Sequence, residues 1–186
     1  MARWLLLAGI LSLSSFAAVA SEIDLNVNDK AVRVAAAVEL RNDVVVDGSY
    51  FYHDDRGDVF GVGLHVTGPF TAGANALRAG LGVRLLRVDS DIRGRDSGTV
   101  LPIGGFVNYR FPGYDRFSLG GSAYYSPDVL SFGDTRRYSE YNAWAAYSVV
   151  RRGQVYLGVR GIKADFERSP EVTFDTGMHL GLRLQF

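Results

Sequence analysis

The chain has 186 residues, enough for one domain, with 20 basic side chains, 20 acidic side chains and no cysteine. The lack of cysteine excludes disulfide frameworks and thiolate metal sites. The balanced charge leaves no basic excess that would attract nucleic acid.

Residues 1–20 differ in character from the rest of the chain. Arg3 supplies a positive charge, an apolar stretch follows, and Ala18-Val19-Ala20 closes it with small residues. This is the layout of a secretory signal peptide cleaved after the last alanine. A membrane-anchoring helix is the less favoured alternative, because such a helix needs about 20 apolar residues. We therefore expect a signal peptide at 1–20 and one exported domain at 21–186.

Beyond the signal, apolar and polar residues alternate, and no run is long enough for a membrane-spanning helix. The last segment shows the alternation most clearly, because one of its two parities is wholly apolar: Met178, Leu180, Leu182, Leu184 and Phe186. The other parity of that segment holds only Gly, His, Arg and Gln. A period of two predicts β-strands with one apolar face.

Turn-forming residues divide the alternating sequence into ten predicted strands, at 22–28, 31–40, 43–53, 58–67, 75–88, 99–110, 115–125, 138–149, 154–166 and 172–186. The first hairpin is the weakest part of this prediction, so eight strands are an alternative. An even number lets the first strand pair antiparallel with the last. We predict an all-β fold: a small, closed, antiparallel transmembrane β-barrel whose apolar face contacts lipid.

The predicted connections differ in length between the two ends of this barrel. The longest, most charged ones, at 89–98 and 126–137, fall at the end opposite the termini, whereas 41–42, 68–74, 111–114 and 150–153 are mostly short. Outer-membrane barrels sort their connections in this way. Aromatic residues near strand ends could form interfacial girdles, or could reflect only the strand preference of Tyr and Phe: Tyr50, Tyr52, Tyr109, Phe111, Tyr114, Phe117, Tyr124, Tyr125, Tyr138, Tyr141 and Phe166.

The inward parity of the strands collects polar side chains, with glycines between them. We predict a polar network in the lumen formed by Asp47, His65, Arg78, Arg84, Asn108, Arg110, Glu140, Asn142, Arg160, Asp175, His179 and Arg183. A barrel of eight to ten strands is only just wide enough for its own side chains. The network therefore predicts a plugged polar core, with a narrow solute path lined by arginine as the alternative. An open porin would need about 16 strands.

No convincing catalytic set or cofactor motif is found. His53 lies beside Asp54 and Asp55 at a predicted outer turn and could form a base with its orienting partner, but no serine has a nucleophile motif. These aspartates with Asp58 match no defined metal-binding loop. We therefore expect no catalytic residues, no metal and no cofactor.

Several segments resemble the YfaZ family of predicted outer-membrane proteins: Gly61–Val66, Tyr124–Phe132, Lys163–Phe166 and Phe174–Gly177. The likeness covers most of the exported domain and is strongest from His53 to Phe186. It implies an outer-membrane barrel of unassigned activity and transfers no catalytic residues. The terminal Phe, with the apolar parity from Met178 to Phe186, also resembles the signal by which the outer-membrane assembly machinery recognises barrel precursors.

Three hypotheses about function follow. The first is an outer-membrane barrel with a structural or interaction role, or with a narrow passage for small solutes, its activity carried by loops 89–98 and 126–138. The second is an enzyme acting on lipid A or phospholipid, which requires a histidine at the outer rim facing lipid. The third is a soluble periplasmic barrel that binds an apolar ligand, which requires an apolar lumen. We expect the first, as a monomer in the outer membrane in contact with lipids and lipopolysaccharide, and no nucleic-acid partner.

Overall fold

The computed structural model describes residues 21–41, 43–69, 77–92, 96–167 and 171–186. The signal peptide predicted at 1–20 lies outside these residues. The described chain folds into these strands and one short 3₁₀ helix: β1 (Glu22–Val27), β2 (Ala31–Arg41), β3 (Val44–His53), β4 (Gly57–Pro69), β5 (Leu77–Ser90), β6 (Ser97–Val100), β7 (Ile103–Arg110), β8 (Phe117–Ser126), η1 (Asp128–Leu130), β9 (Ser131–Gly133), β10 (Thr135–Val150), β11 (Gly153–Phe166) and β12 (Val172–Gln185).

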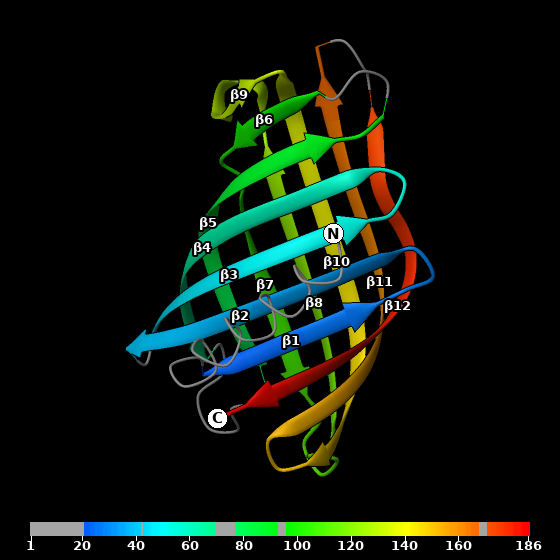
Figure 1. The fold of residues 1–186 in the computed structure, drawn as a ribbon. Coiled ribbons are helices and arrows are strands. Elements are labelled where there is room, and N and C mark those ends of the chain that lie inside the picture. Colours follow the sequence, from blue (N-terminus) through cyan, green and yellow to red (C-terminus); the bar gives the residue numbers. More distant parts are fainter. Residues whose placement is uncertain (1–20, 42, 70–76, 93–95, 168–170) are drawn as a thin grey trace.

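Ten of these strands close into one antiparallel barrel (Figure 1). Each pairs with its neighbour along the chain, and the sheet closes where β1 pairs with β12, with Glu22 opposite Gln185. Closure pairs the backbone N–H and C=O groups of the first and last strands with each other, as a sheet in lipid requires. The prediction of a closed ten-stranded antiparallel barrel is confirmed.

The strand predicted at 99–110 is divided in two. Leu101 and Pro102 separate β6 from β7, and a proline lacks the N–H that a central strand position would donate. Both parts still pair with β5, so they occupy one place in the barrel wall. β6 also pairs with β9, and the two strands lie together at the top of the view in Figure 1.

The two ends of the barrel differ. At the terminal end, where β1 begins and β12 ends, β10 and β11 are joined only by Arg151 and Arg152. At the opposite end, here called the loop end, β5 ends at Ser90, β6 begins at Ser97, and the connection 127–134 contains η1 and β9. The strand ends that flank the two connections predicted to be longest therefore lie at the same end, and residues 93–95 fall outside the described residues. The connection at 70–76 falls outside the described residues.

A band of exposed apolar side chains covers the outside of the barrel. Leu81 is 75% exposed, and Val66 and Leu180 are exposed to a similar degree. Other members are Leu25, Phe60, Val62, Leu64, Val83, Leu85, Ile103, Val107, Leu119, Val155, Leu157, Val159, Met178, Leu182 and Leu184. An exposed apolar surface of this extent marks contact with a membrane or with another protein. On the outside of a closed barrel it is the face expected of a transmembrane barrel.

The pattern inverts at the loop end. There the outward positions are polar, as with Arg87, which contacts Asp89 and Ser97, and Lys163, which contacts Glu171. The inward positions are apolar instead. An apolar inside with a polar outside is the pattern of a sheet in water. The loop end of the barrel therefore projects beyond the apolar band.

The inward apolar residues at the loop end form a compact plug: Ala31, Phe51, Val59, Leu86, Val88, Val100, Tyr138, Ile162, Ala164, Phe166, Val172 and Phe174. They come from eight strands around the barrel, and each is at most 5% exposed. The polar core predicted for the lumen therefore does not extend to this end, where the inward residues are apolar. Tyr138 and Phe166 belong to the plug, and Tyr124 is buried in the lumen, so these three aromatics lie in no interfacial girdle.

Candidate functional site

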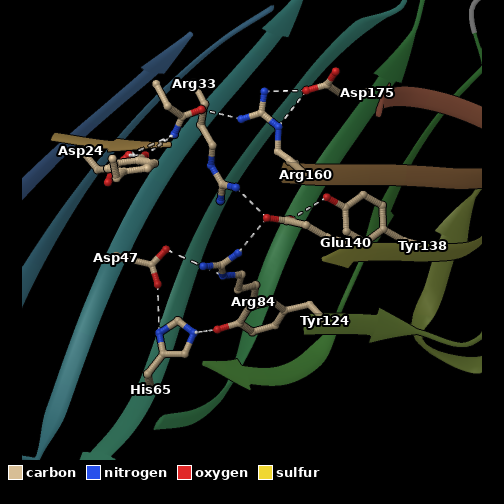
Figure 2. Close-up of polar contacts among 12 residues, drawn as sticks. Asp24, Arg33, Asp47, His65, Arg84, Tyr124, Tyr138, Glu140, Arg160 and Asp175 are labelled. Atoms are coloured by element: carbon tan, nitrogen blue, oxygen red, sulfur yellow. Dashed lines mark hydrogen bonds and ion pairs between the residues drawn. The ribbon is translucent and has the colours of Figure 1, made fainter. Parts of the chain in front are cut away.

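On the terminal side of the plug, a layer of charged side chains extends across the lumen (Figure 2). Glu140 on β10 is at the centre of this layer. Its Oε1 accepts a hydrogen bond of 2.6 Å from Arg33 Nη1 on β2 and lies 3.5 Å from Arg84 Nη1 on β5. Its Oε2 accepts a hydrogen bond of 2.9 Å from the Tyr138 hydroxyl. One carboxylate thus joins two strands on the far side of the lumen to β10.

A second group in the layer is an Asp–His–Tyr chain. Asp47 Oδ1 lies 2.9 Å from His65 Nδ1, and His65 Nε2 lies 2.8 Å from the Tyr124 hydroxyl. A carboxylate at Nδ1 favours the tautomer in which Nδ1–H donates to Asp47 and Nε2 accepts from the tyrosine. The Arg84 guanidinium lies over the Tyr124 ring, with its Cζ atom 4.0 Å from the ring centroid. These contacts fix the direction of Arg84.

Arg160, which is 1% exposed, forms a third group with Asp175. Its Nη2 and Nε atoms donate to Asp175 Oδ2 at 2.6 and 2.8 Å. A β-bulge makes this pair possible, because the β11–β12 register shifts between Ile162 and Lys163. Successive residues Phe174 and Asp175 are consequently both buried inward, the first in the plug and the second in the charged layer.

Asn26 joins this pair to a fourth group. It accepts from Arg160 Nη1, and its amide donates at 3.0 Å to Asp24 Oδ1. Asp24 also accepts from the Tyr156 hydroxyl at 2.7 Å and from Arg183 Nε at 3.0 Å. The four arginines 33, 84, 160 and 183 each lie within 4 Å of at least one of the carboxylates of Asp24, Asp47, Glu140 and Asp175, and Glu22 also lies 3.3 Å from Arg183. An unpaired buried charge would be costly, so this pairing allows the layer to exist.

The structure brings together seven of the twelve residues predicted for the lumen network: Asp47, His65, Arg84, Glu140, Arg160, Asp175 and Arg183. His179 is buried beside Tyr156, but both of its ring nitrogens lack a hydrogen-bond partner among the described residues. Arg78 contacts Glu39 and Thr67 near the terminal end, and Arg110 is exposed.

Sequence reasoning missed several members of the network, namely Asp24, Asn26, Asn28, Arg33, Tyr124, Tyr138 and Tyr156. Asp24, Asn26 and Arg33 lie on the first hairpin and alternate there with apolar residues, so the same parity rule could have found them. The tyrosines were harder to find, because a tyrosine suits either face of a strand.

A cavity of about 300 Å³ lies on the terminal side of the charged layer. Ser21, Glu22 and Gln185 line it where the first and last strands meet, and Arg33, Arg84 and Glu140 line it at depth. The rest of the lining combines polar and aromatic side chains (Asn26, Asn108, Ser122, Asn142, Phe106, Trp144, Tyr124 and Tyr156) with ionisable ones (Asp24, Glu39, Asp47, His65, Arg78 and Arg183) and with Ala35, Ala36, Ala37 and Val45. The lumen therefore consists of an apolar plug, a charged layer and a polar cavity.

Neither a metal site nor the rim histidine of the enzyme hypothesis is found in the described residues. Among them no cluster of acidic and histidine side chains could hold a metal ion, and no helix is long and apolar enough to cross a membrane. His53 is 4% exposed, and its Nδ1 accepts a hydrogen bond from the backbone N–H of Asp55. It is buried within the barrel and does not face lipid.

The family described as YfaZ precursor matches this chain over its whole length, residues 1–186. A relative, the outer membrane protein YfaZ of Escherichia coli (strain K12), is 32% identical over 117 residues, which are 63% of this chain and 60% of that protein. The chain thus matches less than two thirds of that relative's length.

Solved structures of similar shape include a KdgM porin, at 12% identity and TM-score 0.49, with 89% of this chain and 98% of that chain covered. The outer membrane channel DcaP of Acinetobacter baumannii matches at 9% identity and TM-score 0.48, with 88% of this chain and 54% of that chain covered. The curated relative is described as an outer membrane protein. The chain belongs to the YfaZ family and is an outer-membrane β-barrel protein.

Proposed function

We propose that this protein is a closed barrel with a structural or interaction role in the outer membrane, and that it does not conduct solutes in this conformation. The observation that carries the proposal is the apolar plug. Phe174, Val88 and Val100 have no exposed surface, and they meet in the lumen from three different strands. Ions crossing the barrel would have to pass through this buried apolar core and lose their hydration there.

The orientation and assembly of the barrel form part of this proposal. Residues 1–20 would direct export and be removed, and the terminal end would face the periplasm, with connections 91–96 and 127–134 outside. The polar rim at the loop end, including Arg87 and Lys163, would then lie at the level of lipopolysaccharide head groups. The exposed apolar residues at alternate positions from Met178 to Phe186 would serve as the signal that the assembly machinery recognises.

The second candidate function is a narrow passage for small solutes. The polar cavity favours it, because a cavity open at the terminal end provides part of such a path. The charged layer and the plug would have to rearrange to complete it. Catalysis is the weakest candidate, since His53 is enclosed and His65 is engaged on both of its ring nitrogens.

Planar-bilayer recording of the purified protein distinguishes the two candidates. Recovery of heat-modifiable protein from the same membranes would show that a folded barrel had inserted. The closed barrel predicts no stepwise conductance from this inserted protein. Reproducible steps from the wild type would contradict the proposal and favour a passage through the lumen.

A further inference from the structure

The lipid-facing side of the barrel contains a groove of about 570 Å³ that crosses β10, β11, β12 and β1. Ala146, Tyr156 and Gly181 lie opposite one another in the register of β10, β11 and β12, and they line this groove. The side chains of Ala146 and Tyr156 belong to the inward parity and are 4% exposed. On the outside of the barrel these positions present mainly backbone, which forms the floor of the groove.

Outward side chains in the two rows beside this floor form the sides of the groove. Tyr147 and Val155 face each other in the row towards the terminal end, and Ala145 and Leu157 do so in the row towards the loop end. The small side chain of Ala145 leaves the groove open on its strand. Only apolar and aromatic residues line the groove. Its lining therefore suits a hydrocarbon chain.

Aromatic rings gather on the terminal side of this groove. The rings of Phe117 and Tyr147 pack with their centroids 4.9 Å apart, and those of Tyr109 and Phe111 do so at 5.0 Å. Tyr114, in the turn between β7 and β8, is 71% exposed. Tyrosine rings collect at the interface between membrane and water. The turns at this end of β7, β8, β10 and β11 therefore lie at the level of the lipid head groups.

These turns carry arginines that have no acidic partner. Arg116 precedes β8, and its Nη1 atom donates a hydrogen bond of 3.4 Å to the Tyr147 hydroxyl. Arg151 and Arg152 form the turn between β10 and β11, at the bottom of the view in Figure 1. All three are exposed, and none forms an ion pair among the described residues. Against these three arginines, the two turns contain one acidic residue, Asp115.

Exposed basic residues at the loop end differ from these arginines, because each has an acidic partner. The paired residues are Lys30, Arg87, Arg136, Arg137 and Lys163. The protein thus neutralises its surface cations at the loop end and leaves those beside the groove unneutralised. An anionic group from outside the protein would complement them.

We infer that the groove and these arginines together bind one anionic glycerophospholipid. An acyl chain occupies the groove, and the phosphate contacts Arg116 and the turn at Arg151 and Arg152. Guanidinium groups pair well with phosphate oxygens. Val155 is three residues from Arg152, about 10 Å along the strand, which separates the chain from the head group. The choice of a glycerophospholipid over lipopolysaccharide rests on the proposed orientation, in which the terminal end faces the periplasm.

Native mass spectrometry of the full-length protein, purified from the outer membrane in a non-ionic detergent, tests the site. The probes are phosphatidylglycerol and phosphatidylethanolamine with identical acyl chains, and lipid A. We expect each protein to retain one phosphatidylglycerol molecule at concentrations where phosphatidylethanolamine is lost. Arg116→Gln should weaken this retention about fivefold, which corresponds to about 1 kcal/mol for one arginine at a membrane surface.

Matched variants separate the groove and its arginines from the rest of the surface. Ala145→Phe fills the groove and should abolish retention of the lipid. Ala143→Phe should retain it, because Ala143 is exposed on the same strand but does not line the groove. Arg41→Gln should also retain it, since Arg41 is exposed at the end of β2, away from the groove. Heat-modifiability on a gel checks that each variant folds.

Equal retention of the two phospholipids, or equal losses from Arg116→Gln and Arg41→Gln, would overturn the inference. Retention unchanged by Ala145→Phe would overturn the groove as the place of the acyl chain, and tighter retention of lipid A would overturn the lipid class.

The orientation is tested separately with Tyr114→Cys, which a membrane-impermeant maleimide should label only after the outer membrane is permeabilised. Labelling in intact cells would overturn the orientation and the choice of leaflet. Bilayer conductance tests the closed lumen, and none of the retention results depends on it.

Discussion

Arg33 and Glu140 are 107 residues apart in the chain, yet their side chains meet at 2.6 Å across the lumen. Both are almost fully buried. Adjacent strands are held together by backbone hydrogen bonds, whereas opposite walls of the barrel are connected by side chains that cross the lumen, through ion pairs of this kind and through the plug. The charged layer therefore links opposite strands of the barrel. Replacing one of its members should lower the free energy of unfolding more than replacing a surface ion pair does.

Replacing Glu140 tests this link between opposite strands. Glu140→Ala leaves Arg33 and Arg84 without their shared carboxylate, and breaking a buried pair in this way costs about 3–5 kcal/mol. Unfolding by guanidinium in detergent micelles, followed by circular dichroism, measures the loss.

The exposed pair Lys30–Asp55 provides the matched control. Its atoms lie 2.8 Å apart, and the Lys30 ammonium lowers the pKa of the Asp55 carboxyl through this hydrogen bond and its charge. Both side chains are more than half exposed, so solvent screens the pair. Lys30→Met should barely move the unfolding midpoint. Equal losses from Glu140→Ala and Lys30→Met would contradict a structural role for the charged layer.

The plug makes a separate prediction. Leu86 and Phe174 are buried in it, and Leu86→Ala should cost about 2–5 kcal/mol, with a similar or larger cost for Phe174→Ala. Phe60→Ala is the control, because Phe60 lies on the lipid-facing side and is 54% exposed. Thermal loss of the fast-migrating folded band on gels ranks the variants. A plug variant no less stable than Phe60→Ala would show that the apolar cluster is loosely packed.

The apolar band predicts how the barrel responds to charge on its outside. Leu81 lies in the middle of the band on β5, so Leu81→Arg should cost about 2–4 kcal/mol in lipid vesicles. Val129, in η1 at the loop end, is as exposed as Leu81 but lies beyond the band. Val129→Arg should change stability by about 0.5 kcal/mol or less. Equal sensitivity at the two sites would place the membrane boundary elsewhere.

Gly120 is predicted to be essential for the position of Trp144. In Gly120→Ala the added methyl group would occupy the place of the indole ring of Trp144 and displace the ring from the backbone of β8. The overpacking should cost about 1–3 kcal/mol and should shift the emission of Trp144. Gly177→Ala is the matched control on β12, where no heavy atom lies within 4 Å of the added Cβ. An unchanged emission spectrum in Gly120→Ala would mean that the ring does not pack on this glycine.

Much of the fold could be predicted from the sequence, because the period of two reports directly which side chains share a face. The ten strands, the apolar outer band and the inward position of residues such as Glu140 and Arg160 all follow from it. The plug did not follow, although Leu85-Leu86 already places apolar residues on both parities of β5. Alternation gives the faces of a strand, but it does not show where the strand leaves the membrane.

Other features depend on three-dimensional contacts that no local pattern reports. The bulge that turns both Phe174 and Asp175 inward becomes visible only once β12 is paired with β11. The pairing of Arg33 with Glu140 depends on the barrel's diameter and register. The sequence could therefore supply the members of a polar lumen, but not the order of plug, charged layer and cavity along it.

Site-directed spin labelling along β5 tests the closed lumen most directly, and the chain has no cysteine of its own to interfere. Single cysteines would replace Leu81, Leu85, Arg87 and Val88, and labels would be probed with oxygen and with a water-soluble nickel complex. The structure predicts that 81 and 85 are open to oxygen in lipid, 87 to the nickel complex, and 88 to neither. Ready access of the nickel complex to position 88 would contradict the plug, and with it the proposal that this barrel is closed.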